Sequence, residues 1–203
     1  MNPPSPAQPA QQPRASLPAA PSFGRALLAL GLGGFGIGTG EFVIMGLLPD
    51  AARDLGISIP TAGHLISAYA LGVVVGAPVL AGLGARMPRR ALLVALMAFF
   101  ALGNFASAAA PGYLSMMLMR LLTGLPHGTY FGVAALVAAQ LAPAGQRARA
   151  VGYVMLGLTI ATLAGVPIAA GLGQWLGWRA AFALVGAIGV AAALLVQRWI
   201  PDI

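Results

Sequence analysis

Six long apolar segments follow one another along the chain, each near or above the ~20 residues that an α-helix needs to cross a bilayer. They lie at approximately residues 24–48, 62–84, 91–110, 113–141, 149–173 and 178–200. Only 7% of the 203 residues are charged, against about 25% in soluble domains. Eleven arginines, four acidic residues and no lysine are too few to cover a soluble surface. The sequence therefore predicts an all-α membrane protein, with a six-helix transmembrane bundle over residues 23–203.

The first 22 residues differ from the rest of the chain. They contain seven prolines and no apolar run. A signal peptide would need a short charged region followed by a hydrophobic segment. Residues 1–22 are therefore predicted to be a disordered, Pro-rich cytoplasmic tail.

The arginines at the ends of the spans indicate an orientation. One side of the membrane would hold eight of them: Arg14, Arg25, Arg86, Arg89, Arg90, Arg147, Arg149 and Arg198. The other side would hold only Arg53 and Arg179. Because cytoplasmic connections carry the excess of positive charge, both termini are predicted to be cytoplasmic.

Composition also bears on the classes of function. The chain has no cysteine, two histidines and four acidic residues, which is a poor supply of nucleophiles, bases and metal ligands. We expect no enzyme activity, metal site or cofactor. The arginines are scattered rather than gathered on one soluble face, so nucleic acid is not an expected partner.

A charge inside the membrane is the clearest functional signal. Arg120 lies in the apolar run "MMLMRLLTGLPHG", where an arginine costs roughly 2.5–3.5 kcal/mol on insertion scales. Its side chain could snorkel to the outer interface. Glu41 of the first span lies at nearly the same depth and could instead pair with it. Such a pair is either structural or a coupling site at which a proton or substrate occupies the carboxylate.

The residues after Arg120 extend this hypothesis. His127 follows it by two helical turns on roughly the same face, and is either a satisfied buried polar group or a proton relay. Pro126 is expected to kink the span, and Gly124 and Gly128 to add flexibility.

Small residues predict close helix packing in the fifth span. Gly157, Ala161, Gly165, Ala169 and Gly173 recur every four residues and form one ridge. Besides packing, such a smooth face, interrupted by Pro167, could let helices slide or bend during a conformational cycle.

The short connection "ARMPRR" between the second and third spans is a positive-inside anchor. A gating role for Arg86, Arg89 and Arg90 is a further hypothesis.

Several motifs occur together in a specific order. They are "EFVIMGLLPDAARDLGISIPTAGHLISAYALGVVVGAP", "RLLTGLPHGTYFGV", "AGVPIAAGLGQWLGWRAAF" and "WIPDI". With them, residues 24–203 resemble the amino-terminal six-helix half of a major facilitator superfamily transporter of the drug:proton antiporter group, nearest to its arabinose-efflux-like branch. The resemblance implies two six-helix bundles around a central cavity, with alternating access by rocking of the halves.

The resemblance also implies roles for individual residues. Arg120 and Gly124 would belong to an R-x-x-x-G element tied to proton coupling, and Glu41 would face the cavity. The antiporter element of the fifth helix would map to Gly157, Gly165, Pro167 and Gly171. Ala85 stands where the family's inner-loop motif carries an acidic residue, so the inner gate would be reduced.

The expected function is proton-coupled efflux of a small amphipathic compound or drug across a bacterial inner membrane. The alternatives are sugar efflux and a non-transporting, half-length membrane partner. Sugar hydroxyls need amide and carboxylate partners, yet the spans offer only Asn104, with Gln140 and Gln174 near ends. Expected partners are a small-molecule substrate, protons, the lipid bilayer, and a second six-helix half or another copy of the chain, because family members have about twelve helices.

Overall fold

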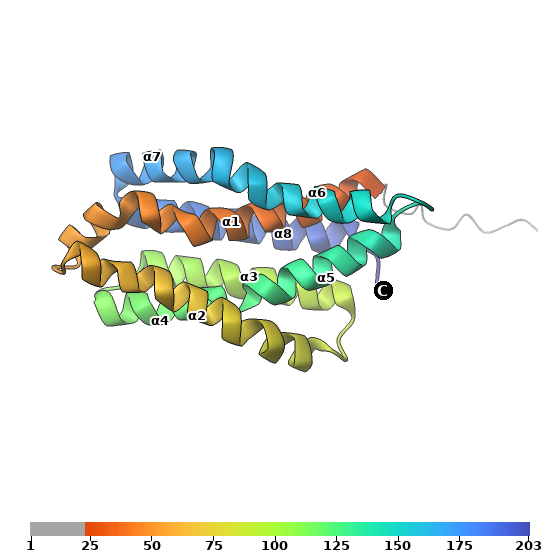
Figure 1. Ribbon diagram of the computed structural model, residues 1–203, viewed down its shortest axis with the longest axis horizontal. Coiled ribbons are helices and arrows are strands. Elements are labelled where there is room, and N and C mark those ends of the chain that lie inside the picture. Colours follow the sequence, from red (N-terminus) through yellow and green to blue (C-terminus); the bar gives the residue numbers. More distant parts are fainter. Residues whose placement is uncertain (1–22) are drawn as a thin grey trace, which may run out of the picture.

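The computed structural model describes residues 23–203, and the predicted tail at residues 1–22 lies outside the described residues. Within the described part, helices run roughly parallel to one long axis (Figure 1). They are α1 (Phe23–Asp54), α2 (Ile59–Gly84), α3 (Arg89–Ala108), α4 (Tyr113–Gly124), α5 (Pro126–Leu141), α6 (Arg147–Ile160), the π-helical turn η1 (Ala161–Gly165), α7 (Val166–Leu176) and α8 (Trp178–Trp199). The predicted all-α fold is confirmed.

The helices of residues 23–203 form six spans that are long and apolar enough to cross a membrane. α4 and α5 together form one span, as do α6, η1 and α7. The first helix is longer than the segment expected from its apolar run, because it continues through Pro49 to Asp54. Hydropathy marks only the part of a helix that suits hydrocarbon, and the helix itself continues beyond that part.

α1 lies at the centre of the packing and touches the helices of all the other spans. One cluster of buried residues fills the half of the bundle that holds the start of α1, and it includes Leu30, Phe100 and Val154. A second cluster fills the opposite half and includes Leu47 and Phe182. Both ends of the bundle thus have a core made by several helices.

The small-residue ridge of the fifth span packs against α1. All five of its members are buried. Gly157 lies so close to the main chain of Gly31 that a Cβ atom there would overlap the Gly31 carbonyl oxygen. Gly165 lies equally close to the side chains of Thr39 and Phe35. These contacts let the two helices approach closely in a solvent that supplies no hydrophobic drive.

Two spans are interrupted next to a proline. α4 ends at Gly124, and Leu125 separates it from α5, which begins at Pro126. In the fifth span the π-helical turn precedes Pro167 by two residues. Proline lacks a main-chain N–H and its ring crowds the preceding turn, so it removes a hydrogen bond from the α-helical ladder and favours an interruption there.

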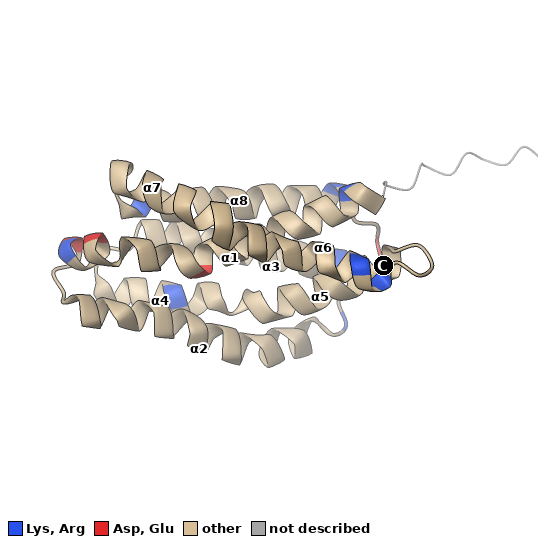
Figure 2. Cartoon of the chain, turned by 45° about the horizontal axis from the view of Figure 1, so that its top comes forward, with Lys and Arg blue, Asp and Glu red and all other residues tan. Residues whose placement is uncertain are grey.

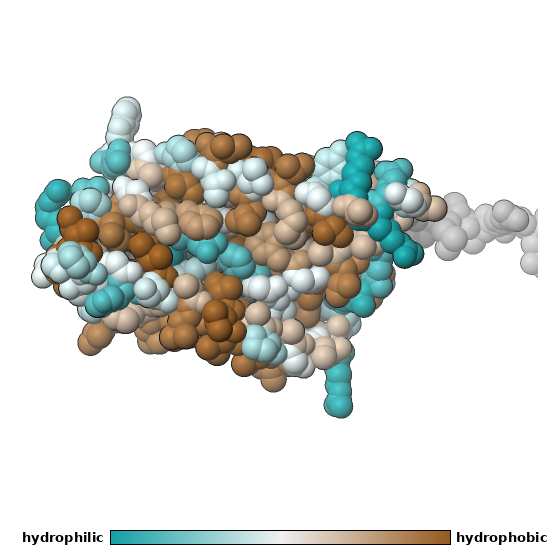
Figure 3. Space-filling model, viewed as in Figure 1, coloured by the Kyte–Doolittle hydropathy of each residue, from teal (hydrophilic) through white to brown (hydrophobic). Residues whose placement is uncertain are grey.

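Charged residues gather at the two ends of the bundle. In its middle, Figure 2 shows charged residues only on α1 and α4. The remaining side surface seen in Figure 3 is largely apolar. At the end of the bundle where α1 stops, Asp50 pairs with Arg53, and Asp54 pairs with Arg179. Trp178 also donates a hydrogen bond to Asp54, at 3.1 Å.

Candidate functional site

Arg120 is completely buried on α4. It does not snorkel, because no part of its side chain reaches the surface. Its Nη1 donates to the Gly40 carbonyl at 2.8 Å and its Nη2 to the Glu41 carbonyl at 3.1 Å. Its Nε donates to the Leu65 carbonyl of α2 at 3.4 Å. The guanidinium thus joins α4 to the main chains of α1 and α2.

Aromatic rings complete the surroundings of this guanidinium. Its central carbon lies 4.3 Å from the ring centroid of Tyr69 and 5.7 Å from that of Phe182. Both distances allow a cation–π attraction, which is stronger where water is excluded. Arg120 is therefore held by carbonyl oxygens and ring faces.

The expected ion pair between Glu41 and Arg120 is not formed. Among residues 23–203, the ion pairs do not include one between these two side chains. Arg120 binds the main-chain oxygen of Glu41 instead of its carboxylate. Matching the depths of two residues cannot tell a carboxylate from a carbonyl, and a planar fork of donors fits the carbonyls of neighbouring helices.

The Glu41 carboxylate lies beside His127. Its Oε2 is 3.7 Å from the imidazole Nδ1, and both side chains are partly exposed, at 26% and 14%. The same Nδ1 lies 3.3 Å from the hydroxyl of Tyr69. Phe131 covers the imidazole from another side, with 5.2 Å between ring centroids. We call Glu41, Tyr69, Arg120 and His127 the mid-membrane cluster.

This cluster brings together residues of three spans, from α1, α2 and the α4–α5 pair. Figure 3 shows hydrophilic residues about midway along the bundle, between α1 and α2, with apolar residues around them. Tyr69 was not expected from the sequence, although a tyrosine within the apolar run "SAYALG" was a signal. Its hydroxyl and ring connect the other members.

Of Arg86, Arg89 and Arg90, the last two have separate contacts in this structure. Arg90 pairs with Asp202 at 2.5 Å and donates to the Ile200 carbonyl at 3.5 Å. The amide of Arg89 donates to the Ile203 carbonyl at 2.9 Å. No ion pair of Arg86 is found among residues 23–203. The start of α3 therefore holds the end of the chain.

The expected bending and packing residues divide into two kinds. Gly124 and Gly128 face α2, where added Cβ atoms would meet Tyr69 and Ala77 respectively. Gly171 has no atom within 4 Å of its Cβ direction, so it is not a packing glycine within this chain. Gly171 instead lines a shallow hollow along α7 with Pro167.

Asn104, the only amide expected inside a span, is fully buried on α3. Its Nδ2 donates to the Phe100 carbonyl at 2.8 Å, and its Oδ1 has no hydrogen-bond partner among residues 23–203. Its side chain is thus enclosed in the bundle, away from any open surface.

Comparison with known protein families identifies the family to which this helical bundle belongs. The profile of the Major Facilitator Superfamily matches residues 30–203. The chain belongs to the major facilitator superfamily. Within this superfamily, it is 52% identical over 164 residues to the inner membrane transport protein YdhP of Escherichia coli, covering 81% of this chain and 42% of YdhP. A chloramphenicol resistance protein of Streptomyces lividans is 41% identical, with coverage of 81% and 42%.

A third superfamily member, named "Probable sugar efflux transporter" in Helicobacter pylori, is 32% identical, with coverage of 85% of this chain and 44% of the relative. The chain thus spans less than half the length of these curated relatives. Two of these three relatives are named for transport or efflux, and the third is named for chloramphenicol resistance.

Solved structures show the same superfamily fold. The xylose transporter XylE of Escherichia coli, in a partially occluded inward open conformation, superposes with a TM-score of 0.79 at 20% identity, covering 89% of this chain and 50% of XylE. A bacterial homologue of the lysosomal transporter Spinster gives a TM-score of 0.75 at 20% identity, covering 89% and 43%. Both likenesses concern the fold.

Proposed function

We propose that this bundle is the amino-terminal half of a proton-coupled exporter of small amphipathic compounds in a bacterial inner membrane. The observation that carries the proposal is the mid-membrane cluster. An acidic side chain of α1 and an imidazole of α5 lie 3.7 Å apart within the membrane-spanning part of the bundle. Ionisable groups at such depth are costly and mark ion or substrate pathways.

Coupling would act through the Glu41 carboxylate. Because main-chain carbonyls hold Arg120, the carboxylate is available to a proton or to a cationic group of a substrate. His127 and the Tyr69 hydroxyl lie next to it as further proton-exchanging groups. In this mechanism the guanidinium supplies a fixed positive charge nearby, and proton and substrate alternate at Glu41 as the halves rock.

An amphipathic substrate suits the surroundings of the cluster better than a sugar. Aromatic rings of Tyr69 and Phe131 lie against the ionisable groups. Asn104 is enclosed, and its amide is not offered to a ligand. The chloramphenicol resistance relative agrees with this choice. Sugar efflux is the second candidate, favoured by the name of the Helicobacter relative.

The complete transporter would need a second six-helix half or another copy of this chain. Relatives more than twice as long as the matched region support this inference. Arg86, Arg89 and Arg90, just before and at the start of α3, would then lie at the inner gate between halves. A non-transporting membrane partner is the alternative, for which the mid-membrane cluster would have no purpose.

A substitution of Glu41 tests the proposal. Glu41→Gln, in a chain completed by its second half, is expected to abolish proton-driven export because the amide cannot exchange a proton. Asp50→Asn is the matched control, since Asp50 lies on the same helix at the outer end. Export would be measured as drug accumulation in vesicles with an imposed pH gradient. Uphill export by Glu41→Gln with an unchanged pH profile would refute the mechanism.

A further inference from the structure

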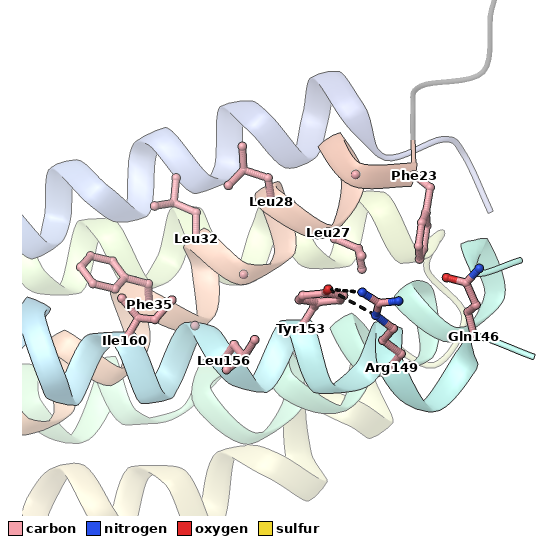
Figure 4. Close-up of a pocket in the computed structure, with 13 residues that line it drawn as sticks. Phe23, Leu27, Leu28, Leu32, Phe35, Gln146, Arg149, Tyr153, Leu156 and Ile160 are labelled. Carbon is pink, nitrogen blue, oxygen red and sulfur yellow. Dashed lines mark hydrogen bonds between the residues drawn. The ribbon is translucent and has the colours of Figure 1, made fainter.

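A groove of about 730 Å³ lies between the amino-terminal half of α1 and α6 (Figure 4), and no residue of the mid-membrane cluster lines it. Its walls are almost entirely apolar, apart from one end. The lining residues are Phe23, Gly24, Leu27, Leu28, Gly31, Leu32, Phe35, Gln146, Arg149, Tyr153, Leu156, Gly157 and Ile160.

The shape of the groove matches one leaflet of a bilayer. α6 rises about 20 Å from Gln146 to Ile160 at ~1.5 Å per residue. One leaflet contributes half of the ~30 Å hydrocarbon core. The groove therefore extends from the inner membrane surface to near the middle of the bilayer, which is the depth that a phospholipid acyl chain occupies.

The groove opens toward the side of the bundle and not toward the mid-membrane cluster. Leu28 and Leu32 lie 13 and nine residues before Glu41, which at 3.6 residues per turn places them on the other side of α1. Leu27 is nearer the face of Glu41 but lies about 21 Å from it along the helix. α1 also packs against α8 on the other side of the groove from α6. The groove is thus a lateral surface of the bundle, and 61% of Leu28 is exposed there.

The inner end of the groove is polar and positive. Arg149 and Gln146 are both exposed there. Arg149 donates two hydrogen bonds to the Tyr153 hydroxyl, at 2.9 and 3.3 Å. Its other guanidinium N–H groups have no protein acceptor among the described residues, and no carboxylate pairs with it there.

The acidic residues of the chain are all elsewhere. Glu41 is in the mid-membrane cluster, Asp50 and Asp54 are at the outer end, and Asp202 pairs with Arg90. A cation at the headgroup level, with an apolar channel leading from it into the membrane, complements an anionic headgroup attached to an acyl chain.

We propose that this groove binds an anionic phospholipid of the inner leaflet. The phosphate of the lipid contacts Arg149 and Gln146, since guanidinium and phosphate make charge-assisted hydrogen bonds. One acyl chain lies along Leu28, Leu32 and Ile160. The proposal depends on insertion in a membrane and is independent of the transport mechanism.

Lipid retention by the purified full chain tests the headgroup contact. The protein would be delipidated in detergent, given equal phosphatidylglycerol and phosphatidylcholine, and the retained lipids counted by native mass spectrometry. Arg149→Gln is expected to weaken phosphatidylglycerol retention about fivefold, the effect of one arginine near a charged surface. Arg147→Gln is the matched control, because Arg147 lies in the same helical turn but does not line the groove.

A second variant tests the acyl channel without altering charge. Leu28→Trp fills the groove and is expected to reduce retention of phosphatidylglycerol, whereas Leu102→Trp, at a 68% exposed position of α3, is expected to leave it unchanged. Equal retention of the two lipids by the wild type, or equal losses in Arg149→Gln and Arg147→Gln, would overturn the proposal. So would an increase in retention on removal of residues 1–22, because that segment would then be the occupant.

Discussion

Arg120 shows how a guanidinium can be held inside a membrane bundle without an ion pair. Its three bonded nitrogens reach carbonyl oxygens of two other helices. Those oxygens also belong to helical main chain, so they remain satisfied within their own helices if Arg120 is removed. The residue is best regarded as a clamp between α1, α2 and α4 that also fixes a positive charge beside Glu41.

The geometry of this clamp leads to a prediction for Arg120→Lys. Lysine keeps the charge but loses the planar fork, so it cannot reach all three carbonyls at once. Hydrogen bonds to charged groups contribute about 1.5–3 kcal/mol each, so we expect a loss of about 3 kcal/mol in unfolding free energy. Denaturant titration in micelles would measure it. Arg53→Lys, in an exposed pair, should change stability by less than about 0.5 kcal/mol, and equal losses would contradict the clamp.

Sequence reasoning located most of the mid-membrane cluster but not its contacts. Charged residues in an apolar run are conspicuous, which is why Glu41, Arg120 and His127 could be named. Tyr69 was missed because a tyrosine is compatible with an ordinary apolar span, and only the fold places it over Arg120. The partner of Arg120 could not be predicted either, because carbonyl oxygens are present at every position and only packing decides which ones come within reach.

At the scale of helices, close packing at small residues was predicted for one span and missed in another. The ridge of the fifth span was predicted from its four-residue repeat. The second span has a similar pair, Gly72 and Gly76, which lies against the main chain of Leu121 and Leu125. The π-helical turn was not predicted, since Pro167 indicated a break but not its type. The position of a helix interruption can be predicted from a proline in the sequence, whereas the type of turn formed there depends on packing against the neighbouring helix.

The contact at Gly76 can be tested against a matched glycine of α2. A Cβ atom at Gly76 would overlap the main chain of Leu125, at the junction of α4 and α5. Overpacking of this kind costs about 1–3 kcal/mol, so Gly76→Ala is expected to lower the unfolding free energy by that amount. Gly82 has open space, so Gly82→Ala should be neutral or stabilising by up to ~1 kcal/mol. Similar effects of both variants on thermal unfolding in micelles would rule out the predicted close contact.

At the scale of the whole molecule, charge distribution predicts orientation. Both outer arginines pair with aspartates, so they add little net charge to that end, whereas Arg90 alone among the inner ones has an acidic partner within residues 23–203. The inner excess of net positive charge is therefore greater than the counts of arginine suggest. We expect both termini in the cytoplasm. A fluorescent protein fused after Ile203 should fold and emit, and alkaline phosphatase at that position should be inactive; the reverse pattern would contradict this orientation.

The polar side of the bundle leads to a prediction of whether these six spans are sufficient for transport. Glu41 and His127 are partly exposed on one side of the bundle, and contact between such polar groups and hydrocarbon would cost several kcal/mol. A second bundle placed against this side would enclose them in a cavity and provide the opposite wall for alternating access. We therefore expect residues 1–203, purified as a monomer and reconstituted in liposomes, to show no saturable flux. Co-reconstitution with a carboxy-terminal six-helix bundle from a full-length relative should restore flux, and Glu41→Gln should abolish it again. Saturable, substrate-specific flux from the monomer alone would show that the bundle is sufficient and that the polar side does not need a second half.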